Sequence, residues 1–166
     1  SGIDNTVVTY AKPVYFVKGQ PIKTFTVGAP FTLVIADTGI SAPTRESVGD
    51  VRKLWEADKP RWERVFDQIG EIARQAKEKI ENGEWQSLGA LMDANHALLQ
   101  TLTVSSPELD RLVEAARRSG ASGAKMSGGG RGGNMIALVE PDIAEAVARS
   151  LKEAGARRVI VTEVGS

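Results

Sequence analysis

The glycines between positions 128 and 133 constrain this chain more than any other feature. Five of those six residues are Gly, out of 17 in a chain of 166 residues. Glycine loses more backbone entropy on folding than any other residue, so such a run makes a poor helix and a poor strand. Strand-like segments flank the run at 124–126 and 135–139. The run therefore predicts a loop between two strands, either a wide hairpin turn or backbone that closely approaches a phosphate.

Two common nucleotide-binding motifs can be compared with this loop. Gly128, Gly130 and Gly133 have the spacing of the dinucleotide-binding fingerprint, but that fingerprint requires a helix directly after the glycines. Here the residues after the glycines predict a strand. A Walker loop, in which Gly-Lys is followed by Ser or Thr, does not occur in the sequence. We therefore expect the loop to form one wall of a site whose other parts come from elsewhere.

The composition excludes several classes of partner. Lys plus Arg and Asp plus Glu number 21 each, and no basic stripe stands out, which argues against nucleic acid or an anionic membrane surface as the partner. The chain has no Cys, which excludes disulfides, a thiolate nucleophile and a Cys-ligated metal. No apolar run approaches the roughly 20 residues of a membrane span. We expect a cytoplasmic protein that binds neither nucleic acid nor membrane.

The chain opens without Met, on the sequence Ser-Gly-Ile-Asp-Asn. We expect a turn there, followed by a short helix over 5–10, because Ser, Asp and Asn all favour helix N-caps. From local sequence alone, Asp4 is best interpreted as such a cap. Strand-like segments at 14–18 and 22–27, separated by Gly-Gln-Pro, predict a hairpin. We expect further sequence before Ser1, and a sheet in that part which the hairpin extends.

The order of the remaining elements predicts an α+β fold. If 44–102 is treated as a helical insertion, the order is strand, helix, strand, strand, helix, strand, which is the split β-α-β pattern of ferredoxin-like domains. The expected strands are 31–36, 124–126, 135–139 and 159–162. Helices are expected over 44–57, from Pro60 to about 80, over 84–102, and from starts at Ser105-Ser106-Pro107-Glu108 and Pro141-Asp142.

Two polar residues and three aromatic ones in the helical region need an interpretation. Asn95 falls in an apolar seam of the helix over 84–102, where it needs a hydrogen-bond partner; that partner is either nearby backbone or a substrate in a cleft. His96, the only histidine, flanks the seam. One His without Cys or clustered carboxylates makes a poor metal site, so we expect no metal ligand in this chain. Trp55, Trp62 and Trp85 are expected to be core anchors.

The opening segment 1–5 and the segment 125–133 together resemble the GHMP small-molecule kinases, and among them most closely mevalonate kinases of bacterial or archaeal type. Segments 36–45, 92–99 and 105–110 support the resemblance, which covers the whole chain but only the C-terminal half of such an enzyme. The resemblance implies a GHMP kinase C-terminal domain over 30–166. It also implies that 1–29, a short helix and a hairpin, is a remnant of the N-terminal domain.

The resemblance further implies a reaction and its residues. The family uses ATP and Mg²⁺ to phosphorylate a hydroxyl of a small molecule, here mevalonate. Asp4 matches the catalytic base. The loop that completes the nucleotide pocket comprises Ser127, Gly128, Gly129, Gly130, Arg131, Gly132 and Gly133, and the substrate cleft is expected to include Gly2, Asn5, Thr38 and Asn95.

These residue types suit phosphoryl transfer, which needs positioning and charge neutralisation more than covalent chemistry. A carboxylate can take the proton of the acceptor hydroxyl, and glycine N–H groups can approach phosphate oxygens without Cβ clashes. Gly129 and Arg131 depart from the family's usual loop, which has Ala after the first Gly and then an unbroken Gly run. Arg131 either adds positive charge near the phosphates or points to solvent, and we expect solvent.

The family's own phosphate loop, its metal-binding Ser and Glu and its active-site Lys belong to the N-terminal half and do not occur here. We therefore expect that these 166 residues alone do not turn over ATP. The expected partners are that missing half, a small-molecule alcohol and, as an open question, a second copy in a homodimer. Two alternatives stand beside this hypothesis. One is another GHMP kinase, for phosphomevalonate, homoserine or a sugar; the other is a non-catalytic ferredoxin-like binding module, which would not need a base at Asp4.

Overall fold

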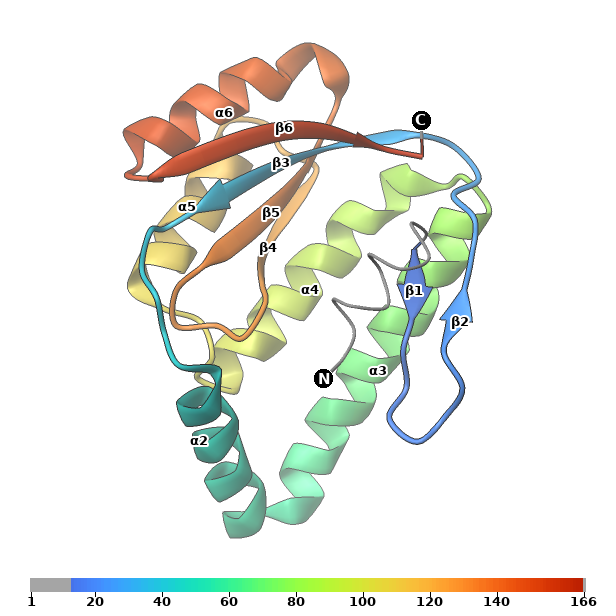
Figure 1. The fold of residues 1–166 in the computed structure, drawn as a ribbon, viewed down its shortest axis with the longest axis vertical. Helices are drawn as coiled ribbons and strands as arrows, with labels where there is room; N and C mark the ends of the chain where they lie inside the picture. The colour runs from blue at the N-terminus through green and yellow to red at the C-terminus, as the bar shows by residue number, and fades with distance from the viewer. Residues whose placement is uncertain (1–12, 166) are drawn as a thin grey trace.

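The computed structural model describes residues 13–165, and its centre is a four-stranded antiparallel sheet (Figure 1). The strands are β3 (Phe31–Asp37), β4 (Gly123–Ser127), β5 (Asn134–Val139) and β6 (Arg158–Val164), and they lie in the order β4-β5-β3-β6. With α5 between β3 and β4, and α6 between β5 and β6, this is the predicted split β-α-β arrangement. The expected α+β, ferredoxin-like fold class is confirmed.

Helices fill the long connection between β3 and β4. They are α2 (Thr44–Ala57), α3 (Lys59–Glu81), the 3₁₀ turn η1 (Trp85–Ser87), α4 (Leu88–Thr101) and α5 (Pro107–Arg118). The turn η2 (Pro141–Ile143) and α6 (Ala144–Glu153) follow β5. The helix expected over 84–102 is therefore a 3₁₀ turn followed by a shorter α-helix.

Local chemistry explains where two of these helices begin. The Asp58 carboxylate accepts the N–H of Arg61 at 3.2 Å, and Pro60 occupies the first turn of α3. At α5 the Ser106 hydroxyl accepts the N–H of Leu109 at 3.3 Å. Both arrangements satisfy N–H groups that a helix cannot pair internally, and both starts were predicted from the sequence.

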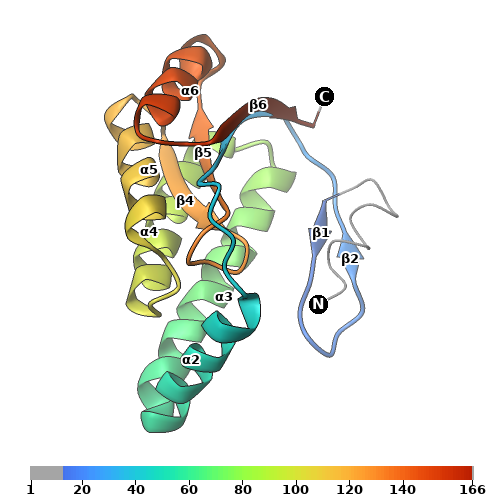
Figure 2. The same cartoon turned by 60° about the vertical axis from the view of Figure 1, so that its left-hand side comes forward.

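The two faces of the sheet pack differently. One face carries alternate residues of the strands, such as Val34 and Met135, and buries them against α5 and α6 (Figures 1 and 2). The opposite face carries Phe31 and Leu138, which form a smaller cluster with α3 and α4. The period of two in a strand produces this division.

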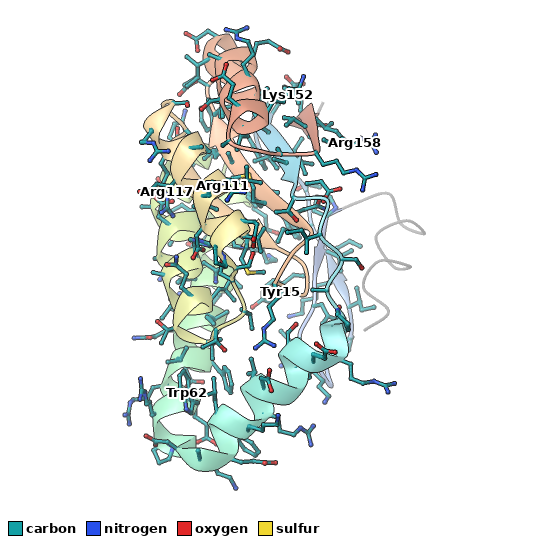
Figure 3. The ribbon with its side chains drawn as sticks, turned by 90° about the vertical axis from the view of Figure 1, so that its left-hand side faces the viewer. Tyr15, Trp62, Arg111, Arg117, Lys152 and Arg158 are labelled. Atoms are coloured by element: carbon teal, nitrogen blue, oxygen red, sulfur yellow. The ribbon has the colours of Figure 1, made fainter. Side chains whose placement is uncertain are left out.

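The tryptophans act as the expected core anchors. Trp62 is buried in the larger cluster near the junction of α2 and α3 (Figure 3). Trp55 and Trp85 are partly buried and pack against the two clusters. Among residues 13–165, none of the helices has the length and apolar character needed to cross a bilayer.

The predicted hairpin is present but short. It consists of β1 (Val14–Tyr15) and β2 (Lys23–Thr24), which pair antiparallel, and not of the longer strands expected over 14–18 and 22–27. Phe16 and Ile22 are exposed, so no apolar packing extends the ladder. In the described part of the chain, the hairpin forms a sheet of its own, separate from the four-stranded sheet (Figure 2). Its link to α3 is Lys77, whose Nζ lies 5.5 Å from the centre of the Phe25 ring, directly after β2. Its extension of another sheet, and the division of the chain at residue 30, stay predictions.

Candidate nucleotide site at the glycine loop

The glycine loop, residues 128–133, connects β4 to β5, as the sequence predicted. Ser127 and Asn134 form the last pair of the ladder before the loop. Gly128, Gly130 and Gly133 have φ values of +91°, +84° and +74°. These values lie in the left-handed region, which a side chain disfavours and glycine adopts freely.

Three loop glycines are also required by close packing. A Cβ on Gly130 would lie 2.0 Å from the carbonyl oxygen of Val104, and one on Gly132 would lie 2.5 Å from that of Ile40. A Cβ on Gly129 would meet the Thr44 hydroxyl at 2.7 Å. In contrast, a Cβ on Gly128 or Gly133 would find no atom within 4 Å. The loop is therefore held closely on one side and open on the other.

The segment after β3 fastens the end of the loop. The Thr38 hydroxyl and the Thr38 N–H both donate to the carbonyl of Gly133, at 3.0 and 2.9 Å. The N–H of Gly133 donates to the carbonyl of Ile40 at 2.9 Å. The structure thus places Thr38, expected in the substrate cleft, behind the loop as one of its supports.

A cavity of about 440 Å³ lies between the glycine loop and the segment after β3. Its lining is rich in glycine and small polar residues, and Arg157 is the only basic residue in it. The stem of Arg157 packs over Gly39, where a Cβ would lie 2.6 Å from Arg157 Cδ. The remaining lining residues are Asp37, Ile40, Ser41, Ala42, Thr44, Ser127, Gly128, Gly129, Gly130, Gly132, Gly133 and Asn134.

This cavity brings together the predicted phosphate loop and residues that the sequence did not indicate. Ser127 and the five glycines line it, and Arg131 does not. Arg157 was missed, and its only signal was a pair of arginines directly before the last strand. Backbone N–H groups with an arginine nearby form a polar environment that suits a phosphate.

The expectation that Arg131 points to solvent is wrong. Its Nη1 donates to Asp50 Oδ2 on α2 at 2.7 Å, and its Nε donates to the carbonyl of Thr103 at 3.3 Å. The Arg131 N–H donates to the carbonyl of Val104 at 2.8 Å. Because the guanidinium finds these partners on neighbouring elements, it turns away from the cavity.

Helix α4 holds β4 in place just before the loop. One oxygen of Asp93 accepts the N–H of Ala124 at 2.9 Å and lies 2.7 Å from the Arg117 guanidinium, which reaches it from α5 (Figure 3). Gly89 and Gly123 let the two backbones touch, since a Cβ on Gly123 would lie 2.2 Å from the Gly89 carbonyl oxygen. The sequence had not singled out this anchor.

His96 is buried on the same side of α4 and serves the structure. Its Nδ1 accepts the N–H of Met126 at 3.3 Å, and its Nε2 lies 3.1 Å from Asp110 Oδ1. Burial lowers the pKa of His96, against the opposing effect of the Asp110 carboxylate. In residues 13–165, no group of three or more His, Cys, Asp or Glu could hold a metal ion.

Asn95 lies on the other side of α4 and lines a second, largely apolar cavity. This cavity has a volume of about 410 Å³ and lies between the second face of the sheet and helices α3 and α4. Lys125 also lines it, and its Nζ donates to the carbonyl of Met126 at 2.8 Å. Burial lowers the pKa of Lys125. The sequence placed Asn95 among apolar residues correctly, and its role in a substrate cleft stays a prediction.

Gly2, Asp4 and Asn5 lie outside the described residues. Their roles as cleft residues and as the catalytic base are therefore untested. The expected helix over 5–10 also lies outside the described part of the chain. The described elements follow the expected order.

The family is decided by residues 76–157, which match the model described as "GHMP kinases C terminal". The chain carries a GHMP kinase C-terminal domain. It is 38% identical to the mevalonate kinase of Pyrococcus abyssi, over 96% of this chain and 48% of that protein. The GHMP resemblance that the sequence motifs suggested is thereby confirmed.

Solved structures of this GHMP family have the same fold. The crystal structure of L. major mevalonate kinase in complex with R-mevalonate is 36% identical and matches 98% of this chain and 52% of that chain, with a TM-score of 0.91. The mevalonate kinase of Staphylococcus aureus MRSA252 matches with a TM-score of 0.74 at 28% identity, over 100% of this chain and 52% of that one. The chain spans about half the length of the curated relatives it matches.

Proposed function

We propose that this chain forms the C-terminal half of an ATP-dependent kinase that phosphorylates mevalonate to 5-phosphomevalonate. The observation that carries the proposal is the match to L. major mevalonate kinase, whose crystal structure contains R-mevalonate, over 98% of this chain. The cavity at the glycine loop is consistent with this function. It has a polar, glycine-lined wall on which a phosphate could rest.

The glycine loop would hold the phosphates of ATP. Gly128 faces open space, so its N–H group could approach a phosphate oxygen without steric conflict. The Ser127 hydroxyl lies at the start of the loop and could donate another hydrogen bond. Arg157 would add positive charge to the lining of the same cavity. Asp37 would keep its orientation, because its Oδ1 accepts the N–H of Gly39 at 2.8 Å.

Asp4 would act as the base. Its carboxylate would accept the proton of the mevalonate hydroxyl while the oxygen forms a bond to the γ-phosphorus and ADP leaves. Mg²⁺, when bound, would neutralise charge on the phosphates. Its ligands would come from the N-terminal half, as the resemblance to the GHMP kinases implies, since residues 13–165 contain no group of three or more His, Cys, Asp or Glu that could hold the ion.

The partners of this chain follow from the same proposal. The missing N-terminal half, in the same polypeptide or in a separate chain, would supply the second wall of the site and the substrate-binding residues. We propose the cytoplasm, with its supply of ATP, as the compartment of the reaction. A homodimer stays a prediction, which light scattering of the complete protein would test.

The decisive experiment measures ADP release by the complete protein with R-mevalonate and with a panel of other acceptors. The panel contains phosphomevalonate, homoserine and galactose. We expect ADP release that depends on R-mevalonate, and 5-phosphomevalonate as the product by mass spectrometry. A preference for another acceptor would assign the chain to a different GHMP kinase. Nucleotide binding without ADP release from any acceptor would favour a binding module.

A further inference from the structure

Arg131 is the only residue with a side chain between positions 128 and 133. Its φ is +59°, in the left-handed region that a Cβ disfavours. Thr103 is the only other described non-glycine residue with a positive φ, also +59°. The two residues are joined directly, because Arg131 Nε donates to the Thr103 carbonyl at 3.3 Å. Unfavourable backbone conformations persist where the surrounding contacts determine them.

The contacts of Arg131 attach the middle of the loop to two other parts of the fold. Its side chain reaches Asp50, 81 residues away on α2, at 2.7 Å. Its backbone N–H reaches Val104, in the connection between α4 and α5, at 2.8 Å. The neighbouring Gly129 packs directly on Thr44, at the start of α2. The helix α2 and the turn at 103–104 therefore both support the middle of the loop, and Arg131, Asp50, Thr103 and Val104 do not line the cavity.

The Arg131 guanidinium is already engaged by protein groups. Asp50 pairs with both Lys53 and Arg131, and both cations lower its pKa. The side chains of Arg131 and Asp50 are 31% and 38% exposed, so solvent weakens the pair without abolishing it. A phosphate could recruit Arg131 only by breaking the contacts to Asp50 and Thr103.

We propose that Arg131 is a positioning residue that fastens the glycine loop to α2 through Asp50, and does not itself bind the phosphates. The inference rests on the proposed function, because the loop must hold a nucleotide for its position to affect catalysis. If Arg131 has this role, α2 influences ATP binding even though Asp50 does not contact the phosphates. The loop amides keep their spacing because one side of the loop is tied to a rigid helix.

The test compares R131Q, D50N and the double variant in the complete protein. We expect each single variant to raise the KM for ATP by roughly three- to fivefold, with kcat within about twofold of the wild type. The double variant should match the single variants, because both break the same contact. If Arg131 bound phosphate directly, R131Q would raise the KM for ATP far more than D50N, and the double variant would show the sum of the two effects. That result would overturn the proposal.

K53Q is the matched control. Lys53 pairs with the same Asp50 carboxylate at 2.9 Å, but it is 79% exposed and lies on α2 itself, three residues from Asp50. The substitution removes one positive charge, as R131Q does. It should leave the KM for ATP unchanged if the tie to the loop is what matters. R131K should restore part of the loss, because the Lys ammonium can pair with Asp50 but has no second nitrogen to reach the Thr103 carbonyl at the same time.

Hydrogen exchange of the loop amides separates this inference from the proposed function. In D50N without nucleotide, the amides of residues 128–134 should exchange faster than in the wild type, and those in K53Q should not. If the exchange rates in D50N were unchanged, Arg131 would not position the loop through Asp50, whatever the enzyme's activity. If the wild type consumed no ATP with any acceptor, the proposed function would be overturned. The exchange result would still test whether the Arg131–Asp50 contact positions the loop.

Discussion

His96 and Met126 are joined by a buried hydrogen bond, in which the Met126 N–H donates to Nδ1 of His96 at 3.3 Å. Nδ1 must therefore be unprotonated, and the proton of the neutral ring is assigned to Nε2, which faces Asp110. Asp110 also accepts the Ser105 hydroxyl at 2.5 Å. One imidazole thus connects α4, β4 and α5, one residue before the strand ends and the glycine loop begins.

Replacement of His96 should weaken the whole domain. H96A would leave the Met126 N–H without its acceptor and create a cavity, at a cost of about 2–4 kcal/mol in the free energy of unfolding. H96N should cost less, because its side-chain oxygen can accept the same N–H. Urea unfolding of the complete protein, followed by tryptophan fluorescence, measures both variants. Equal stability of H96A and wild type would contradict this role.

The lowered pKa of His96 predicts how stability depends on pH. The unfolded protein would bind a proton at His96 near the ordinary pKa of 6.5, whereas the folded protein would bind it only at lower pH. Stability should therefore be fully present above pH 6.5 and fall as the pH decreases from 6.5 through the folded pKa. The slope should not exceed about 1.4 kcal/mol per pH unit. H96N should lose this dependence, and a wild type as flat as H96N would exclude it.

Two glycines of the loop allow the effect of packing to be separated from that of backbone conformation. Gly130 and Gly128 have similar φ values, but only a Cβ on Gly130 would collide with backbone, 2.0 Å from the Val104 oxygen. G128A should cost only the left-handed strain, about 1–2 kcal/mol. G130A should cost more, because the turn at 103–104 must move. Melting temperatures of the two variants test this order, and equal values would contradict it.

Arg157 should contribute to nucleotide binding through its position at the cavity of the glycine loop. R157Q should raise the KM for ATP by roughly fivefold and leave the melting temperature nearly unchanged, because the side chain is exposed. R158Q is the matched control, since Arg158 is also exposed but does not line the cavity. Equal KM values for ATP in the two variants would show that Arg157 does not contribute to nucleotide binding.

Asp4, outside the described residues, carries the chemical step in the proposed function. D4N in the complete protein should lower kcat by orders of magnitude and leave ATP affinity nearly intact, because the amide cannot accept the proton but keeps the size of the carboxylate. Steady-state kinetics and nucleotide titration measure the two quantities. An unchanged kcat would return Asp4 to the role of a helix cap.

The sequence by itself determined the parts of this protein that depend on near neighbours. Pro60 and Ser106 predict helix starts, because the fixed φ of proline and the cap of a serine act within one turn. The glycine run announces a loop because residues without Cβ disfavour regular structure. Short apolar runs predicted the strands, and the order of the elements was enough to predict their ferredoxin-like pairing.

Only the tertiary structure decided which residues meet across the chain. The loop end is held by Thr38, 95 residues from Gly133, and Arg131 is held by Asp50, 81 residues away; no local rule couples positions so far apart. Asn95 and His96 show the same limit within one helix. Adjacent residues point about 100° apart, and α4 packs on both sides, so periodicity alone could not assign the buried imidazole to the core and the amide to a cavity.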